Sequence, residues 1–259
     1  MTEHIQKLVD GGVMRLAFNR PDKKNAITRD MYSALADGLA EADATPSVRV
    51  VVLAAEGDIF TAGNDMLDFM EHPPHAEKDP RQAPVFRFLK AIATAQKPLI
   101  ASVNGAAIGV GMTMLLHCDM VIAVEDAVLQ TPFVNLALVP EAASSLILPR
   151  LVGHQLASEI LLTGAKIPAK RAYDTGLVNA VVAADRLEAE TMERARSLAA
   201  LPPVAVRQSK QLIRGDTAEI LQRIEEEGAV FSERLQSEEF KEAATAFMER
   251  RAPDFSKFG

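Results

Sequence analysis

The chain has 259 residues and a net charge of −7, and 48% of its residues are hydrophobic. This length and composition suffice for one large buried core or two modest ones. The acidic balance argues against non-specific binding to nucleic acid or anionic membranes. Trp is absent and Tyr occurs twice, so stacking on nucleic-acid bases is not predicted. The single cysteine, Cys118, excludes an internal disulfide and suits a reducing compartment, where we expect a buried, unreactive thiol.

No segment of the sequence has the pattern of a membrane span or an export signal. The most apolar stretch, residues 105–124, is interrupted by Thr113, His117 and Asp119 and contains three glycines, so it predicts buried core. The first four residues lack the basic-then-apolar pattern of a signal peptide. The sequence therefore predicts a cytoplasmic protein.

The first half of the chain alternates predicted helices and strands. Thr28 is typical of a helix N-cap, after which Met31, Leu35, Leu39 and Ala42 fall on one helical face. Apolar runs, the first of them rich in β-branched residues, predict buried strands at residues 48–55, 99–103, 120–124 and 178–182. This alternation is typical of an α/β fold.

Two later segments differ from this pattern. Residues 71–84 contain four prolines and mixed charges, which predicts a loop, and long loops in compact domains often form lids or binding walls. From residue 185 helix formers dominate, and helices are predicted at residues 187–200, 204–214, 217–236 and 238–251. We therefore predict a core at residues 1–184 and a helical region at residues 185–259.

Two glycine-containing turns follow predicted strands, at residues 61–65 (TAGND) and 105–111 (GAAIGVG). A helix that starts at Gly109 or Val110 leaves its first N–H groups unpaired, and two such donors from separate turns can hold a developing oxyanion. Tight packing of strand, turn and helix is the alternative interpretation. A dinucleotide site fits poorly, because Met114 stands where the third glycine of that motif belongs.

Glu141 is the single charged residue between Ala127 and Pro149. Apolar surroundings raise the pKa of a carboxyl group, which makes its ionised form a stronger base. Alternatively, Pro140 and Glu141 begin a helix, where an acid interacts favourably with the helix dipole. Histidines at metal-ligand spacing on a helix are absent, so no metal site is predicted.

The order and spacing of these motifs resemble the enoyl-CoA hydratase/isomerase family, also called crotonases. The resemblance covers nearly the whole chain, and its motifs are specific in combination. They are Asn19-Arg20-Pro21, Asn25-Ala26, residues 60–65, Asn104-Gly105, Gly109-Val110-Gly111, Cys118-Asp119, Pro140-Glu141, Leu151-Val152-Gly153, Leu162-Thr163-Gly164 and residues 172–178.

The resemblance implies a crotonase (ClpP-like) spiral of ββα units whose helical C-terminal region builds a homotrimer or a dimer of trimers. It implies an acyl-CoA thioester substrate, so coenzyme A would arrive as part of the substrate and no cofactor would be bound permanently. The backbone N–H groups of Asn64 and Val110 would form the oxyanion hole. The residues implied to bind CoA or substrate are Lys23, Ala26, Ala62, Asp65, Met66, Gly109 and Phe133.

Departures from the family pattern favour one reaction. Hydratases of this family use two glutamates, whose positions hold Thr113 and Phe133 in this chain. Peroxisomal-type Δ3,Δ2-enoyl-CoA isomerases have one catalytic glutamate at the position of Glu141, which would shuttle a proton from C2 to C4 within an apolar pocket formed by Phe133 and Leu138. The resemblance thus implies isomerisation in fatty-acid or related acyl-CoA catabolism. The alternatives are an enoyl-CoA hydratase with Glu141 as base, and a non-catalytic acyl-CoA-binding crotonase.

Overall fold

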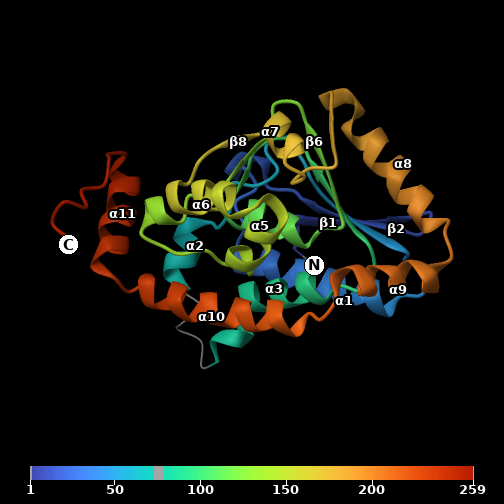
Figure 1. The fold of residues 1–259 in the computed structure, drawn as a ribbon, viewed down its shortest axis with the longest axis horizontal. Helices are drawn as coiled ribbons and strands as arrows, with labels where there is room; N and C mark the ends of the chain where they lie inside the picture. The colour runs from blue at the N-terminus through green and yellow to red at the C-terminus, as the bar shows by residue number, and fades with distance from the viewer. Residues whose placement is uncertain (1, 73–78, 259) are drawn as a thin grey trace.

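The computed structural model describes residues 2–72 and 79–258, and its main sheet contains six strands (Figure 1). The strand order is β1-β2-β3-β4-β6-β9, and each pair except β1–β2 is parallel. The strands are β1 (Ile5–Asp10), β2 (Val13–Phe18), β3 (Val50–Ala55), β4 (Leu99–Val103), β6 (Met120–Val124) and β9 (Ala180–Val182). The α/β class is therefore confirmed, and the four predicted strands are the central and distal strands of this sheet.

The hairpin of β1 and β2 was not predicted. Asp10 pairs with Val13, so Gly11 and Gly12 form a two-residue turn, with φ of 54° and 82° respectively. A tight hairpin turn in which both central residues have positive φ matches the twist of the strands, and glycine adopts it without steric cost.

A second, three-stranded sheet joins the turns that follow the main strands. It consists of β5 (Ala107–Ile108), β7 (Val128–Gln130) and β8 (Ile167–Pro168), in that order. A bridge between Thr61 and Ala107 connects the segment after β3 to the segment after β4. Both glycine turns therefore lie beyond the carboxyl ends of adjacent parallel strands, where α/β folds place their ligands.

The first predicted helix is confirmed as α1 (Arg29–Ala44). The Thr28 hydroxyl accepts a hydrogen bond from the Met31 N–H group, and the four residues predicted to share a face are buried. The other helices before residue 185 are α2 (Met66–Glu71), α3 (Pro84–Thr94), α4 (Val110–Thr113), α5 (Ser144–Val152), α6 (His154–Thr163) and α7 (Ala169–Asp174). The 3-10 helices there are η1 (Pro21–Lys23), η3 (Pro80–Gln82), η4 (Met114–His117), η5 (Val134–Leu136) and η6 (Ala184–Arg186).

The segment predicted as a loop at residues 71–84 is described only in part. Residues 73–78 lie outside the described residues. On either side, α2 ends at Glu71, and η3 leads into α3, which starts at Pro84. The role of this segment as a lid or binding wall stays a prediction.

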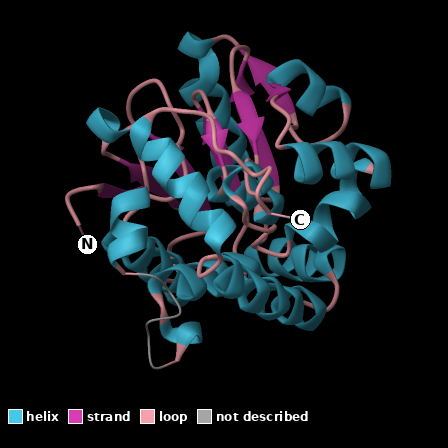
Figure 2. Ribbon diagram, turned by 90° about the vertical axis from the view of Figure 1, so that its left-hand side faces the viewer, coloured by secondary structure: helices cyan, strands magenta, loops and turns pink. Residues whose placement is uncertain are grey.

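The C-terminal region is helical as predicted, with α8 (Leu187–Ala199), α9 (Pro203–Arg214), α10 (Ala218–Arg234) and α11 (Glu238–Glu249). Figure 2 shows helices on both sides of the strands and a further group of helices below them. Helix α8 packs on the main sheet, where the Thr191 hydroxyl donates to the Ser102 hydroxyl at 3.2 Å. The division at residues 184 and 185 stays a prediction, and it falls within η6.

The apolar stretch 105–124 forms β5, α4, η4 and β6 inside the fold. Within the described ranges, no helix has the length and hydropathy needed to cross a membrane. Cys118 is half-buried, and loss of water raises the pKa of its thiol to about 12, which fits the expected unreactive thiol.

Candidate active site

Glu141 lies in the loop before α5, so the prediction that it stands in the first turn of a helix is wrong. Helix α5 begins at Ser144, and the two residues between, Ala142 and Ala143, have φ of 59° and 56°. A non-glycine residue in this left-handed region costs roughly 1–2 kcal/mol, so contacts from elsewhere must hold the loop. A local helical reading could not anticipate this turn, because alanine carries no signal for positive φ.

Two side chains from α4 and η4 hold the loop on one side. The Thr113 hydroxyl donates a hydrogen bond to the Glu141 carboxylate. The His117 ring donates from Nε2 to the Ala142 carbonyl oxygen at 2.8 Å, since that oxygen can only accept. Burial lowers the pKa of His117 to about 4 and so keeps the ring neutral. The position that holds a glutamate in the hydratases is therefore occupied by a hydrogen-bond partner of Glu141.

A second carboxylate holds the same loop from α10. The side chain of Glu227 accepts hydrogen bonds from the N–H groups of Ala143, at 2.6 Å, and Ser145, at 2.9 Å. Glu227 is only 7% exposed. It therefore serves as the cap that α5 lacks in its own sequence, because the N-cap residue is an alanine without a side-chain acceptor.

The environment of Glu141 makes it a stronger base than an ordinary carboxylate. Burial raises the pKa of its carboxyl group to about 8; the hydrogen bond from Thr113 opposes this shift, and the negative charge of Glu227 adds to it. A carboxylate with a pKa in this range can both accept and return a proton near neutral pH.

The two glycine turns meet beyond the ends of β3 and β4. In a parallel bridge, Ile27 donates its N–H to the Gly63 carbonyl at 2.8 Å, and the Asp65 N–H donates to the Ile27 carbonyl at 3.0 Å. Successive residues of an extended strand present their backbone groups to opposite sides, so the N–H of Asn64 points away from Ile27. A Cβ atom on Gly63 would approach the Ile108 carbonyl oxygen to 2.8 Å, which shows how closely the second turn lies.

The second turn ends in the predicted helix start. Gly109 is the N-cap of α4 and has φ 57° and ψ −123°, a conformation suited to glycine. Val110 is the first residue of α4, so its N–H has no acceptor within the helix. The N–H group of Val110 therefore lacks a helical acceptor and that of Asn64 points away from Ile27, and an oxyanion hole formed by the two groups stays a prediction.

A small cavity lies against Glu141, with a volume of about 30 Å³. Helices α2, α3 and α10 supply most of its wall, and Asn64 lies on it as well, with its side-chain oxygen accepting from the Tyr32 hydroxyl. The lining residues are Asn64, Phe69, Val85, Phe86, Leu89, Glu141, Ala142, Ile224, Gly228, Phe231 and Ser232. Phe133 and Leu138, which were predicted to form this wall, are not among its lining residues, most of which come from helices far from Glu141 in the sequence.

Phe133 lies behind the wall. Its ring contacts that of Phe231 edge to face, with centroids 6.4 Å apart, and Phe231 in turn contacts Phe69. Phe133 also approaches the second glycine turn, since a Cβ on Gly109 would lie 4.0 Å from the Phe133 ring. The hydratase glutamate position is thus filled by an aromatic side chain that supports the cavity.

The residues predicted to bind CoA come together at the edge of the first turn. Ala62 donates its N–H to the Lys24 carbonyl at 3.0 Å, which joins the segment containing Lys23 and Ala26 to the segment after β3. Met66 follows directly as the first residue of α2. Binding of CoA to these residues stays a prediction.

The Asp65 side chain has structural contacts that the sequence did not reveal. Its carboxylate accepts the Leu67 and Asp68 N–H groups at the start of α2 and forms an ion pair with Arg20 at 2.6 Å. Partial burial would raise the pKa of Asp65, but the hydrogen bond from Arg20 and those from α2 lower it, so the group is ionised. Asp65 therefore contributes its backbone to the predicted CoA surface while its side chain fixes the turn.

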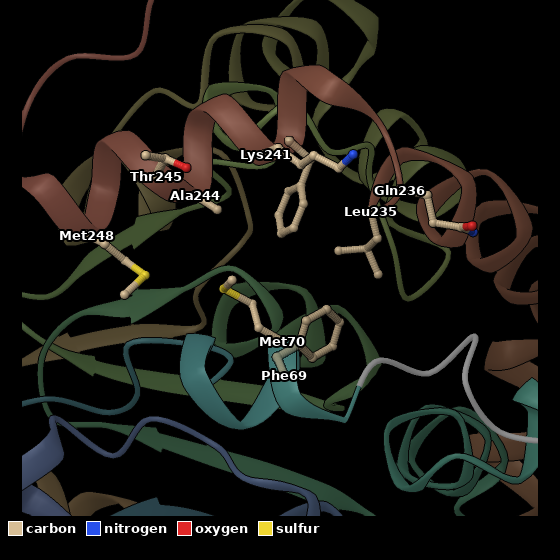
Figure 3. Close-up of a pocket in the computed structure, with 9 residues that line it drawn as sticks. Phe69, Met70, Leu235, Gln236, Lys241, Ala244, Thr245 and Met248 are labelled. Carbon is tan, nitrogen blue, oxygen red and sulfur yellow. The ribbon is translucent and has the colours of Figure 1, made fainter.

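An apolar groove of about 350 Å³ lies between α2 and α11. Figure 3 shows Phe69 and Met70 of α2 opposite Leu235 and helix α11, with Lys241 close by. This groove was not expected from the sequence. The spacing of Phe240, Ala244 and Met248 by four residues is the signal that could have indicated an apolar face here.

Over residues 2–72 and 79–258, no group of three or more His, Cys, Asp or Glu side chains has a metal-binding arrangement.

Comparison with known proteins identifies the family. The sequence pattern of the family described as Enoyl-CoA hydratase/isomerase matches residues 9–257, so the chain belongs to this family. Enoyl-CoA delta isomerase 2 of Rattus norvegicus is 36% identical over 245 residues, which cover 93% of this chain and 62% of that protein. This chain therefore spans less than two thirds of the length of that relative.

Two further comparisons give a relative named as a hydratase and a solved structure with the same fold. The 2,3-dehydroadipyl-CoA hydratase of Escherichia coli K12 is 32% identical over 94% of either chain. The crystal structure of an enoyl-CoA hydratase/isomerase from Pseudoalteromonas atlantica T6c has a TM-score of 0.92 at 45% identity, covering 98% of this chain and 100% of that chain. The crotonase spiral predicted from the sequence is thereby confirmed.

Proposed function

We propose that this chain is an enoyl-CoA isomerase that moves a double bond of an acyl-CoA thioester from C3 to C2. The observation that carries the proposal is the buried carboxylate of Glu141, which lines a cavity together with Asn64 of the first glycine turn. Glu141 removes a proton from C2, and the electrons move into the thioester carbonyl. The N–H groups of Asn64 and Val110 stabilise the resulting oxyanion, and the protonated Glu141 returns the proton to C4.

The surroundings of Glu141 support proton transfer over activation of water. Among the described residues that line the cavity, Glu141 is the one carboxylate, and most of its neighbours there are apolar. Addition of water needs one group to deprotonate water and another to deliver a proton to carbon. Isomerisation needs one group alone, because the same carboxyl group can remove and return the proton. Coenzyme A enters as part of the substrate in this proposal, along Lys23, Ala26, Ala62 and Met66, and no further cofactor takes part.

Substitution of the base tests the proposal. Glu141→Gln keeps the shape of the side chain and a carbonyl oxygen for Thr113 but removes the basic oxygen. We expect isomerisation of a 3-enoyl-CoA to fall by about 10²–10⁴-fold while binding of the CoA ester, measured by calorimetry, is retained. Unchanged turnover in this variant would contradict the proposal.

A second candidate is hydration of 2-enoyl-CoA with Glu141 as the base. It is favoured by the relative named as a 2,3-dehydroadipyl-CoA hydratase, which matches 94% of this chain. A cavity of about 30 Å³ also has room for about one water molecule. Side-by-side spectrophotometric assays of 2-enoyl and 3-enoyl thioesters distinguish the two candidates. Hydration that is faster than isomerisation selects the second candidate. Binding of both thioesters without turnover indicates a non-catalytic protein.

A further inference from the structure

Glu227 stands on α10, 86 residues after Glu141 in the sequence, yet it contacts the loop that carries Glu141. Both of its carboxylate oxygens are used: Oε2 accepts from the Ala143 N–H at 2.6 Å and Oε1 from the Ser145 N–H at 2.9 Å. Burial raises the pKa of Glu227, and the hydrogen bonds from Ser145 and Ala143 oppose that rise because they favour the ionised form. The side chain is buried, so water cannot readily replace it as the acceptor.

The loop that Glu227 contacts adopts a conformation that its own residues do not favour. Ala142 and Ala143 are consecutive left-handed residues, and Ala143 offers α5 no side-chain cap. The direction in which Glu141 leaves the backbone depends on these two residues. A contact that fixes the Ala143 N–H therefore also fixes the orientation of the Glu141 carboxylate.

We propose that Glu227 is a positioning residue for Glu141, whose carboxylate clamps the Ala143 and Ser145 N–H groups and holds the base-bearing loop in its left-handed conformation. This proposal rests on the proposed function of Glu141 as the base. Glu227 acts through the loop and not by touching substrate, since it does not line the cavity beside Glu141.

The charge of Glu227 gives this role a second, electrostatic effect. Two other titratable groups near this loop are neutral near pH 7: Tyr32 of α1, which interacts with Glu141 and whose pKa burial raises, and His117 of η4, which donates to Ala142 and whose pKa burial lowers. The negative charge of Asp68 on α2 also raises the pKa of Tyr32. Arg223 of α10 donates a hydrogen bond to the Ser145 hydroxyl. The negative charge of Glu227 opposes ionisation of Glu141 and so raises its pKa.

Two substitutions separate the clamp from the charge. Glu227→Gln removes the charge and one acceptor, so we expect kcat to fall by about 10–100-fold with KM changed less than about threefold. The acid limb of the pH–rate profile should move to lower pH by about 0.5–1 unit, because Glu141 loses a like charge. Glu227→Asp keeps the charge on a shorter side chain, so kcat should fall while the limb stays near its wild-type position.

Glu225→Gln is the matched control, because Glu225 is exposed on the same helix and carries the same charge. It should leave kcat and the pH limb unchanged. The proposal is overturned if Glu227→Gln retains wild-type kcat, or if the acid limb of its pH–rate profile stays at the wild-type pH. Should Glu227→Gln not fold, as judged by circular dichroism, wild-type kcat in Glu227→Asp would overturn it instead.

The outcome is distinguishable from a failure of the proposed function. If wild-type enzyme isomerises and Glu141→Gln does not, normal Glu227 variants reject the positioning role alone. If Glu141→Gln remains active, the role of Glu141 as the base is rejected, and the clamp has no base to position.

Discussion

At the scale of the residue, burial makes Glu141 more basic and also lowers the stability of the folded protein when this carboxyl group is ionised. A carboxyl group that is ionised in water at pH 7 has its pKa raised to about 8 here, because the folded chain removes its hydration. The ionised form is thus destabilised by folding. The pKa of Glu141 is 4.5 in the unfolded chain and about 8 in the folded one, so the unfolded chain releases this proton at lower pH. The free energy of unfolding should therefore fall as the pH rises from 4.5 to 8.

Glu141→Gln should therefore stabilise the protein in alkaline solution. The neutral amide avoids the penalty of a buried charge, so we expect a gain on the order of 2–3 kcal/mol at pH 9 and little change at pH 5. Urea unfolding at the two pH values measures both. Equal effects at pH 5 and pH 9 would mean that the Glu141 pKa is not raised.

The sequence indicated Glu141 as a candidate base but did not indicate which residues fix the loop that carries it. Its isolation among apolar residues between Ala127 and Pro149 was visible in the sequence, and burial of the carboxyl group agrees with it. The contacts of Glu227 with the loop could not be predicted, because they join positions more than 80 residues apart and involve alanines in a conformation their side chains do not signal.

At the scale of the element, the buried parallel strands of the main sheet were predictable, whereas the antiparallel β1–β2 hairpin and the two-residue strands were not. Runs such as residues 99–103 and 120–124 are apolar because both faces of a central parallel strand are covered, and their bounds match the sequence prediction. β5 and β8 contain two residues each, too few to show a period. They matter all the same, since β5 carries the turn that contains Gly109.

The conformation of Gly109 should be needed for this turn. In Gly109→Ala, the added Cβ meets no atom closer than 4.0 Å, so the cost comes from φ 57° and ψ −123°. We expect a loss of about 1–3 kcal/mol in stability, measured by urea unfolding, and a fall in kcat because the Val110 N–H moves.

Gly153→Ala provides the control for that experiment. Gly153 has φ 81° and open space around its Cβ position, and it lies at the other end of α5 from Glu141. It should lose stability with unchanged kcat. An equal fall in kcat for both variants would show that the Gly109 effect is general instability.

At the scale of the whole molecule, α9 leaves a pair of large apolar side chains in contact with solvent. Leu212 is 83% exposed and Ile213 is 85% exposed. Neighbouring apolar residues at this exposure are typical of surfaces that bind another protein chain. We propose that α9 contributes to the homotrimer, or dimer of trimers, that the family resemblance implies.

Replacing Leu212 and Ile213 together by serine should shift the assembly toward monomers, because the apolar area buried between chains is lost. Size-exclusion chromatography with light scattering measures the mass. Leu162→Ser on α6, at a single position that is 69% exposed, is the control and should leave the assembly intact. A wild-type protein that runs as a monomer would refute this proposal.

Transfer of an isotopic label tests the central claim, that one buried carboxylate moves one proton. A 3-enoyl-CoA carrying deuterium at both C2 positions is converted in ordinary water, and the product is analysed by mass spectrometry and NMR. Because Glu141 is only 9% exposed, we predict a 2-enoyl-CoA that retains one deuterium at C2 and gains one at C4. Complete loss of the transferred deuterium to solvent, or a product hydroxylated at C3, would contradict the account.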